Sequence, residues 1–145
     1  MRRSGSTTRS GPGRTSSRTG ILVTARELNS QFEWAAHEPE ALGQGISAEI
    51  FEVIKHRRDT SGLDEADVIV IELARAIFGA RTVPSETFAR SLQQFGRRKL
   101  VDLIALMGNY ASTAALLRRL RHATRQGCGR RKAALFRILL KQIRS

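Results

Sequence analysis

Residues 21–39 read ILVTARELNSQFEWAAHEP, and this stretch decides the helical character of the chain. Apolar side chains recur in it at steps of three and four, which predicts an amphipathic helix that Pro39 can end. The apolar positions are Ile21, Ala25, Leu28, Phe32 and Ala35. Polar residues form a second stripe roughly opposite, through Arg26, Ser30, Glu33 and His37. Because apolar residues flank the polar stripe, we expect this helix to be buried or at an interface.

The polar stripe contains a candidate acid/base pair, Glu33 and His37. A spacing of four residues places both side chains on one helix face, one turn apart. The carboxylate can fix the tautomer of the imidazole and favour its protonated form, which is the arrangement of a general acid/base. The alternative is an ordinary helix pair on a solvated face, worth roughly 0.2–0.5 kcal/mol.

The following residues, up to Leu117, also show helical rather than alternating periodicity. Ser47 is expected to be the N-cap of one helix, Pro84 precedes the start of another, and Gly96 is expected to end that second helix. The expected helices span residues 48–58, 63–79, 85–96 and 100–117, with a short helical turn at 39–45. We therefore predict an all-α bundle of five to six helices.

Charge divides the 145 residues into three parts. Residues 1–20 carry five arginines and no acid, and residues 118–145 carry ten basic residues and no acid. Residues 21–117 hold all 13 acidic residues and are slightly acidic, although the whole chain has a net charge of +12. We expect a disordered basic segment over 1–20, a helical domain over 21–117 and a basic tail over 118–145.

The composition excludes several classes of site and gives no sign of others. The single cysteine, Cys128, excludes a disulfide, a CxxC redox centre and a cysteine-based zinc site within one chain. The histidines lie in separate segments, so we expect no metal site, and we expect no cofactor. The most apolar run, residues 103–117, is shorter than the roughly 20 residues that span a bilayer, and residues 1–20 lack the apolar core of a secretory signal. We expect a cytoplasmic protein without membrane contact.

Several pieces of the sequence resemble the carboxymuconolactone decarboxylase-like family, which shares its helical fold with alkyl hydroperoxide reductase D-type proteins. The most specific piece is the string E-W-x-x-H-E-P within residues 24–39. Softer matches are residues 41–47, 83–90 and 100–110, so the resemblance covers about two thirds of the chain. It implies an all-α fold that assembles into trimers or hexamers, with the Glu33/His37 helix near subunit contacts.

For the decarboxylase branch, the resemblance implies cofactor-free chemistry on a lactone acid. We expect His37 to be the general acid/base that protonates the carbanion or enolate left after CO₂ loss, and Glu33 to orient it. Arg26 and Ser30 share the stripe and could hold a carboxylate of a small organic-acid substrate. Trp34 is assigned to substrate binding, with a core or subunit contact as the alternative. For Arg26 the alternative is a salt bridge with Glu33 or capping with Ser30.

The peroxidase branch implies a different chemistry that these residues do not support. Its CxxC motif would lie four residues ahead of the histidine, where this chain has Ser30 and Glu33. A peroxiredoxin-like antioxidant by that mechanism is therefore disfavoured. A degenerate, non-catalytic family member with basic tails is the remaining alternative.

The C-terminal tail has its own interpretation. Residues 117–127 can be encoded so that the neighbouring reading frame resembles the family's last helix, and we hypothesise that residues 118–145 are an out-of-frame translation. A frame check on the encoding DNA tests this: without similarity in a neighbouring frame, the hypothesis fails. Ten basic residues could also attract phosphates or a membrane surface, but no nucleic-acid motif accompanies them, and we expect no specific nucleic-acid partner.

Overall fold

The computed structural model describes residues 14–125, and its regular structure is entirely helical. This confirms the predicted all-α class and the expected number of helices for that part of the chain. The elements are α1 (Arg14–Glu27), α2 (Gln31–Gly43), α3 (Ala48–Lys55), α4 (Glu65–Ala74), a π-helical segment η1 (Arg75–Ala80) and α5 (Ser85–Arg125). Cys128 lies outside the described residues.

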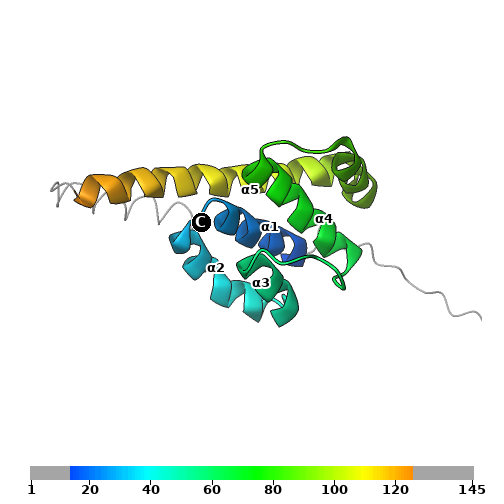
Figure 1. Ribbon diagram of the computed structural model, residues 1–145, viewed down its shortest axis with the longest axis horizontal. Helices are drawn as coiled ribbons and strands as arrows, with labels where there is room; N and C mark the ends of the chain where they lie inside the picture. The colour runs from blue at the N-terminus through cyan, green and yellow to red at the C-terminus, as the bar shows by residue number, and fades with distance from the viewer. Residues whose placement is uncertain (1–13, 126–145) are drawn as a thin grey trace, which may run out of the picture.

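Helix α1 is central and contacts α2, α3, α4, η1 and α5. It lies beneath the long helix α5 in Figure 1, with α2 and α3 on its other side. It begins at Arg14, so the expected boundary between residues 20 and 21 is wrong for residues 14–20. Thr19 and Gly20 are buried, and the Thr19 hydroxyl donates to Asp67 Oδ1 at 3.3 Å. Small side chains therefore allow this part of α1 to pack inside the domain.

Gly20 is the point of close approach between α1 and α5. A Cβ atom built on Gly20 would lie 3.3 Å from Leu103 Cδ1 and 3.3 Å from both Met107 Cγ and Met107 Sδ. These distances are shorter than ordinary van der Waals contacts, so a larger side chain would require the two helices to separate or Met107 to repack.

The single helix expected over residues 21–37 is two helices, and this prediction was wrong. Asn29 adopts a left-handed conformation with φ 52°, after which the chain turns into α2. The amide of Asn29 donates to the carbonyl of Arg26, and that of Ser30 donates to the carbonyl of Ala25 at 2.8 Å. These two bonds are the pattern of a Schellman C-terminus, in which asparagine tolerates the left-handed position.

The new direction of α2 changes which side of it is buried. The helix continues through Pro39 to Gly43, so Pro39 does not end it, and most of the helical turn expected at 39–45 is the last part of α2. Its buried residues are Glu33, His37 and Ala41, whereas Ala35 is exposed. The polar stripe therefore faces inward along α2.

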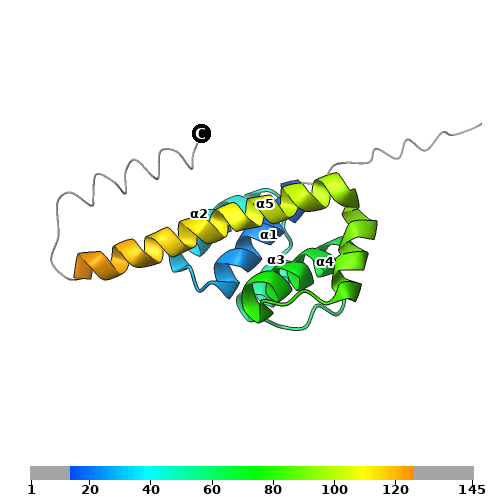
Figure 2. The same cartoon turned by 90° about the horizontal axis from the view of Figure 1, so that it is seen from above.

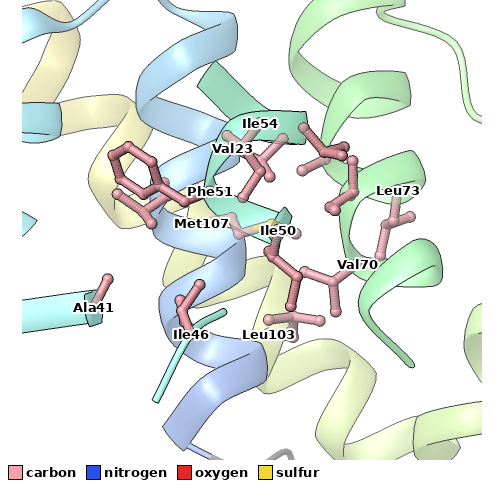
Figure 3. Packing of buried hydrophobic residues seen from close by; sticks show 14 of the residues in the cluster. Val23, Ala41, Ile46, Ile50, Phe51, Ile54, Val70, Leu73, Leu103 and Met107 are labelled. Atoms are coloured by element: carbon pink, nitrogen blue, oxygen red, sulfur yellow. The ribbon is translucent and has the colours of Figure 1, made fainter. Parts of the chain in front are cut away.

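The hydrophobic core fills the space between α1, α3, α4 and α5. Figure 3 shows side chains from these helices meeting around α1. Ser47 caps α3 as predicted, since its hydroxyl accepts from the amide of Ile50 at 3.3 Å. The fully buried large side chains include Leu22, Val23, Ile54, Val70, Ile71, Leu73, Leu103 and Met107. These residues pack α1 against α3, α4 and α5.

Helix α5 bends sharply at Gly96, where φ is 73° and ψ is 163° (Figure 2). The expected helix end at Gly96 is thus a kink, and the second part continues past Leu117 to Arg125. By length and composition alone, Ser85–Arg119 contains a stretch apolar enough to cross a membrane, and 33% of that stretch is buried in the structure. The core helix of a soluble protein passes the same test, so this feature places the chain in neither class.

Candidate functional site

Glu33 and His37 form a direct pair inside the domain. His37 Nε2 lies 3.4 Å from Glu33 Oε2, and the exposed fractions of the two side chains are 11% and 3%. The spacing of four residues on α2 produces the contact, and the Schellman turn before α2 directs it toward α1 and α5. The expected pairing of these two side chains is therefore present, in a buried rather than a solvated setting.

The second carboxylate oxygen of Glu33 has an unusual environment. Oε1 is buried, and within the described part of the chain it has no hydrogen-bond partner. An unpartnered buried oxygen costs free energy, so most native proteins avoid it outside functional sites. Glu33 thus offers an unused acceptor beside the imidazole.

The other edge of the imidazole faces a carboxylate and a guanidinium. His37 Nδ1 lies 3.6 Å from Glu40 Oε2 and 3.5 Å from Arg18 Nη1. Arg18 also forms an ion pair with Glu40 through Nη2 and donates from Nε to Gln44 Oε1 at 3.2 Å. Arg18 comes from α1, so two helices contribute to this edge.

The only tyrosine of the chain, Tyr110, packs against the same imidazole. Its ring meets the His37 ring edge-on, with centroids 4.9 Å apart and an interplanar angle of 86°. Burial raises the pKa of the Tyr110 phenol; Arg18 opposes this, and the Glu33 and Glu40 carboxylates add to it. The phenol therefore stays a neutral hydrogen-bond donor at neutral pH.

These contacts define how the imidazole can carry its proton. With Nε2–H donating to Glu33, Nδ1 of the neutral ring can accept from Arg18 Nη1. A protonated Nδ1 would instead donate toward Glu40 Oε2. His37 therefore has a fixed partner on Nε2 and two competing partners on Nδ1, which suits a group that gives and takes a proton at Nδ1.

The expected substrate-binding residues lie elsewhere. Arg26, Ser30 and Trp34 line a hollow of about 350 Å³ between α1, α2 and α3, and neither Glu33 nor His37 lines it. Arg26 donates from Nε to the carbonyl of Lys55 at 2.7 Å and from Nη1 to Asn29 Oδ1 at 3.3 Å. The structure thus brings the three residues together but separates them from the acid/base pair, because Arg26 belongs to α1 and Trp34 lies on a different side of α2 from the buried Glu33 and His37.

Three residues in contact with His37, namely Arg18, Glu40 and Tyr110, were not predicted from the sequence. Arg18 lies in the segment expected to be disordered, Tyr110 in the helix expected over 100–117, and Glu40 in the short helical turn expected at 39–45. The positions of Glu33, His37 and Glu40 do follow helical spacing, so reading the helix through Pro39 would have found Glu40. No sequence signal connected Arg18 or Tyr110 to the pair.

Two further polar residues are exposed and lie outside these contacts. His56 is exposed at the end of α3. Asn109, next to Tyr110 in sequence, is also exposed. Among residues 15–119, no group of three or more His, Cys, Asp or Glu side chains is arranged to hold a metal ion.

Comparisons of the chain with protein-family models, with curated proteins and with solved structures found no match. We therefore infer function from the geometry of the residues around His37. These residues, together named the His37 cluster, are Arg18, Glu33, His37, Glu40 and Tyr110.

Proposed function

We propose that the protein is a cofactor-independent proton-transfer enzyme of the carboxy-lyase type, acting on a small carboxylated substrate. The observation that carries this proposal is the buried Glu33–His37 contact, with one Glu33 oxygen unpartnered and an arginine at the outer edge of the imidazole. A purely structural ion pair would be expected to use both carboxylate oxygens.

The chemistry assigns one role to each side of the imidazole. The C–C bond to the departing carboxylate breaks, CO₂ leaves, and the electron pair remains on the substrate as an enolate or carbanion. His37 then delivers the proton on Nδ1 to that carbon, while Glu33 keeps Nε2–H in place and stabilises the imidazolium that precedes the transfer. Solvent reprotonates His37 for the next cycle.

Arg18 is the cation that this mechanism uses in place of Arg26. Its guanidinium reaches both His37 and Glu40, and the Glu40 side chain is 45% exposed. A substrate carboxylate could displace Glu40 from Arg18, because a carboxylate binds a guanidinium equally well whether it belongs to a side chain or to a ligand. This exchange would place the substrate next to Nδ1.

Tyr110 completes the polar surroundings of the transferred proton. A phenol that remains protonated at neutral pH can donate a hydrogen bond to an enolate oxygen. Its edge-on contact also limits rotation of the His37 ring.

The test is CO₂ release from a panel of small lactone and keto acids, measured for the native chain and two histidine variants. We expect His37→Gln to lower turnover about 10²- to 10⁴-fold, the usual contribution of a general acid or base. His56→Gln is the matched control, since His56 also contacts a glutamate four residues earlier, and its turnover should be unchanged. Equal turnover of both variants and the native chain would contradict the acid/base role.

We also propose, from the resemblance to the carboxymuconolactone decarboxylase-like family, that the chain forms a trimer or hexamer. Val101 and Leu116 on the second part of α5 are more than half exposed and would be covered in such an assembly. Light scattering after size exclusion should give a discrete mass of three or six chains. A monomer at micromolar concentration would count against this assembly.

A further inference from the structure

The hollow between α1, α2 and α3 contains an excess of positive charge. Its lining includes Arg26, Lys55 and His56 and, within the described residues, no acidic side chain. The glutamates nearest in sequence to Arg26 and Lys55 pair with other residues: Glu27 with Arg57 at 3.2 Å, and Glu52 with His56 of the lining at 3.3 Å. Arg26 and Lys55, the two permanent cations of the hollow, therefore have no acidic partner among its lining residues.

Arg26 is held in a fixed orientation there. Nε and Nη1 donate to the Lys55 carbonyl and to Asn29 Oδ1, and both acceptors are uncharged. No hydrogen bond of Nη2 is found in the described part of the chain. A guanidinium held by neutral acceptors keeps its full charge and its remaining N–H groups available, which preorganises it for an anion.

Lys55 and Ser30 add adaptable polar groups at the same place. Lys55 is exposed and forms no ion pair within residues 15–119; its ammonium lies 5.8 Å from the centre of the Phe51 ring. The hydroxyl of Ser30 precedes α2 without making the usual cap hydrogen bond. Both groups can therefore turn toward a bound anion at little cost.

Trp34 gives the hollow an apolar wall. Its ring packs against Phe51 with centroids 4.9 Å apart and an interplanar angle of 53°, which fixes its orientation. A hollow of about 350 Å³ lies at the small end of the range for ligand sites, roughly 300–1,000 Å³. A flat unsaturated ring could pack on the indole while an attached anionic group meets the cations.

We propose that this hollow binds a small carboxylate that carries an aromatic or other planar group. This site is separate from the His37 cluster and does not depend on the proposed proton-transfer function. Arg26 and Lys55 would hold the carboxylate, and Trp34 would contact the planar group.

The chain contains its own reporter for this site, because Trp34 is its only tryptophan. Titration of the full-length protein with benzoate should change the Trp34 fluorescence in a saturable way, and added salt should weaken the binding. Acetate, which lacks the ring, should bind at least about tenfold more weakly, the difference that burying a small apolar group produces. Absence of a saturable change with benzoate, or equal affinity for acetate, would overturn the proposal.

Two charge-matched variants show whether the hollow is the place of binding. Lys55→Gln removes a cation that lines the hollow, and we expect it to weaken benzoate binding about three- to fivefold. Arg58→Gln removes the same charge from an exposed position outside the lining and should leave the affinity unchanged. Equal effects of the two variants would contradict a specific site. Because neither change touches His37, loss of benzoate binding and loss of turnover are independent results.

Discussion

The chain contains two glutamate–histidine pairs of identical spacing, and they differ only in their surroundings. Glu33–His37 has an N–O distance of 3.4 Å and Glu52–His56 one of 3.3 Å. The first pair has exposed side-chain fractions of 3% and 11%, whereas the second has 45% and 48%. Helical spacing therefore produces the contact in both, and burial alone gives one of them an environment in which proton transfer can be controlled.

The largest difference between the pairs should come from removing the carboxylate charge. Glu33→Gln should lower proposed turnover by about 10²-fold or more, because the imidazolium loses its stabilising partner. The same change should raise the free energy of unfolding by about 1 kcal/mol, since a buried carboxylate with an unpartnered oxygen is costly and a neutral amide is less so. Activity assays and chemical denaturation measure the two effects.

Glu52→Gln is the control for this prediction. It changes the same group at an exposed site, so its free energy of unfolding should stay within about 0.5 kcal/mol of the native value. If Glu33→Gln instead destabilised the protein and left turnover intact, Glu33 would be a structural residue and the comparison would lose its functional meaning.

A smaller effect should be visible on Tyr110, whose absorbance reports only on the buried pair. As the only tyrosine, it can be titrated directly, and its pKa should lie above 10.0 because burial disfavours the phenolate. Glu40→Gln should lower this pKa and Arg18→Gln should raise it, since the carboxylate and the guanidinium act in opposite directions. Glu52→Gln should not shift the titration at all.

The smallest effect concerns stability in alkaline solution and follows from the same raised pKa. Above pH 10.0 the unfolded chain loses the phenol proton first, so stability should fall as the pH rises from that value through the folded pKa. Tyr110→Phe removes this contribution, and its stability should decline less over that range. Parallel declines for the native chain and the variant in denaturation experiments would show that Tyr110 is not buried enough to matter.

The sequence predicted the helical class because apolar periodicity is a local property. The Ser47 cap and the helix start after Pro84 depend on residues within one turn, and both agree with the structure. The break at Asn29 could not be seen in this way, because Asn29 and Ser30 fit the spacing of a continuous polar stripe as well as they fit a turn. Periodicity alone does not distinguish these two conformations.

The candidate site was predictable only where it lies within one helix. Glu33 and His37 could be paired from their spacing, whereas Arg18 and Tyr110 reach His37 through the packing of α1 and α5. The arginine-rich composition of residues 1–20 also concealed Arg18, because an average over the segment does not show that its last residues are small enough to be buried. The contacts of Arg18 and Tyr110 with His37 therefore depend on long-range packing, which helical spacing in the sequence does not show.

The close approach of α1 and α5 at Gly20 affects the distances between the residues around His37. Gly20 follows Arg18 by two residues on α1, and its neighbour Met107 precedes Tyr110 by three residues on α5. A wider crossing at Gly20 would move the guanidinium and the phenol apart although neither was altered. The spacing of the groups around His37 therefore depends on an apolar contact, and substitutions in the core that change no polar group should alter it.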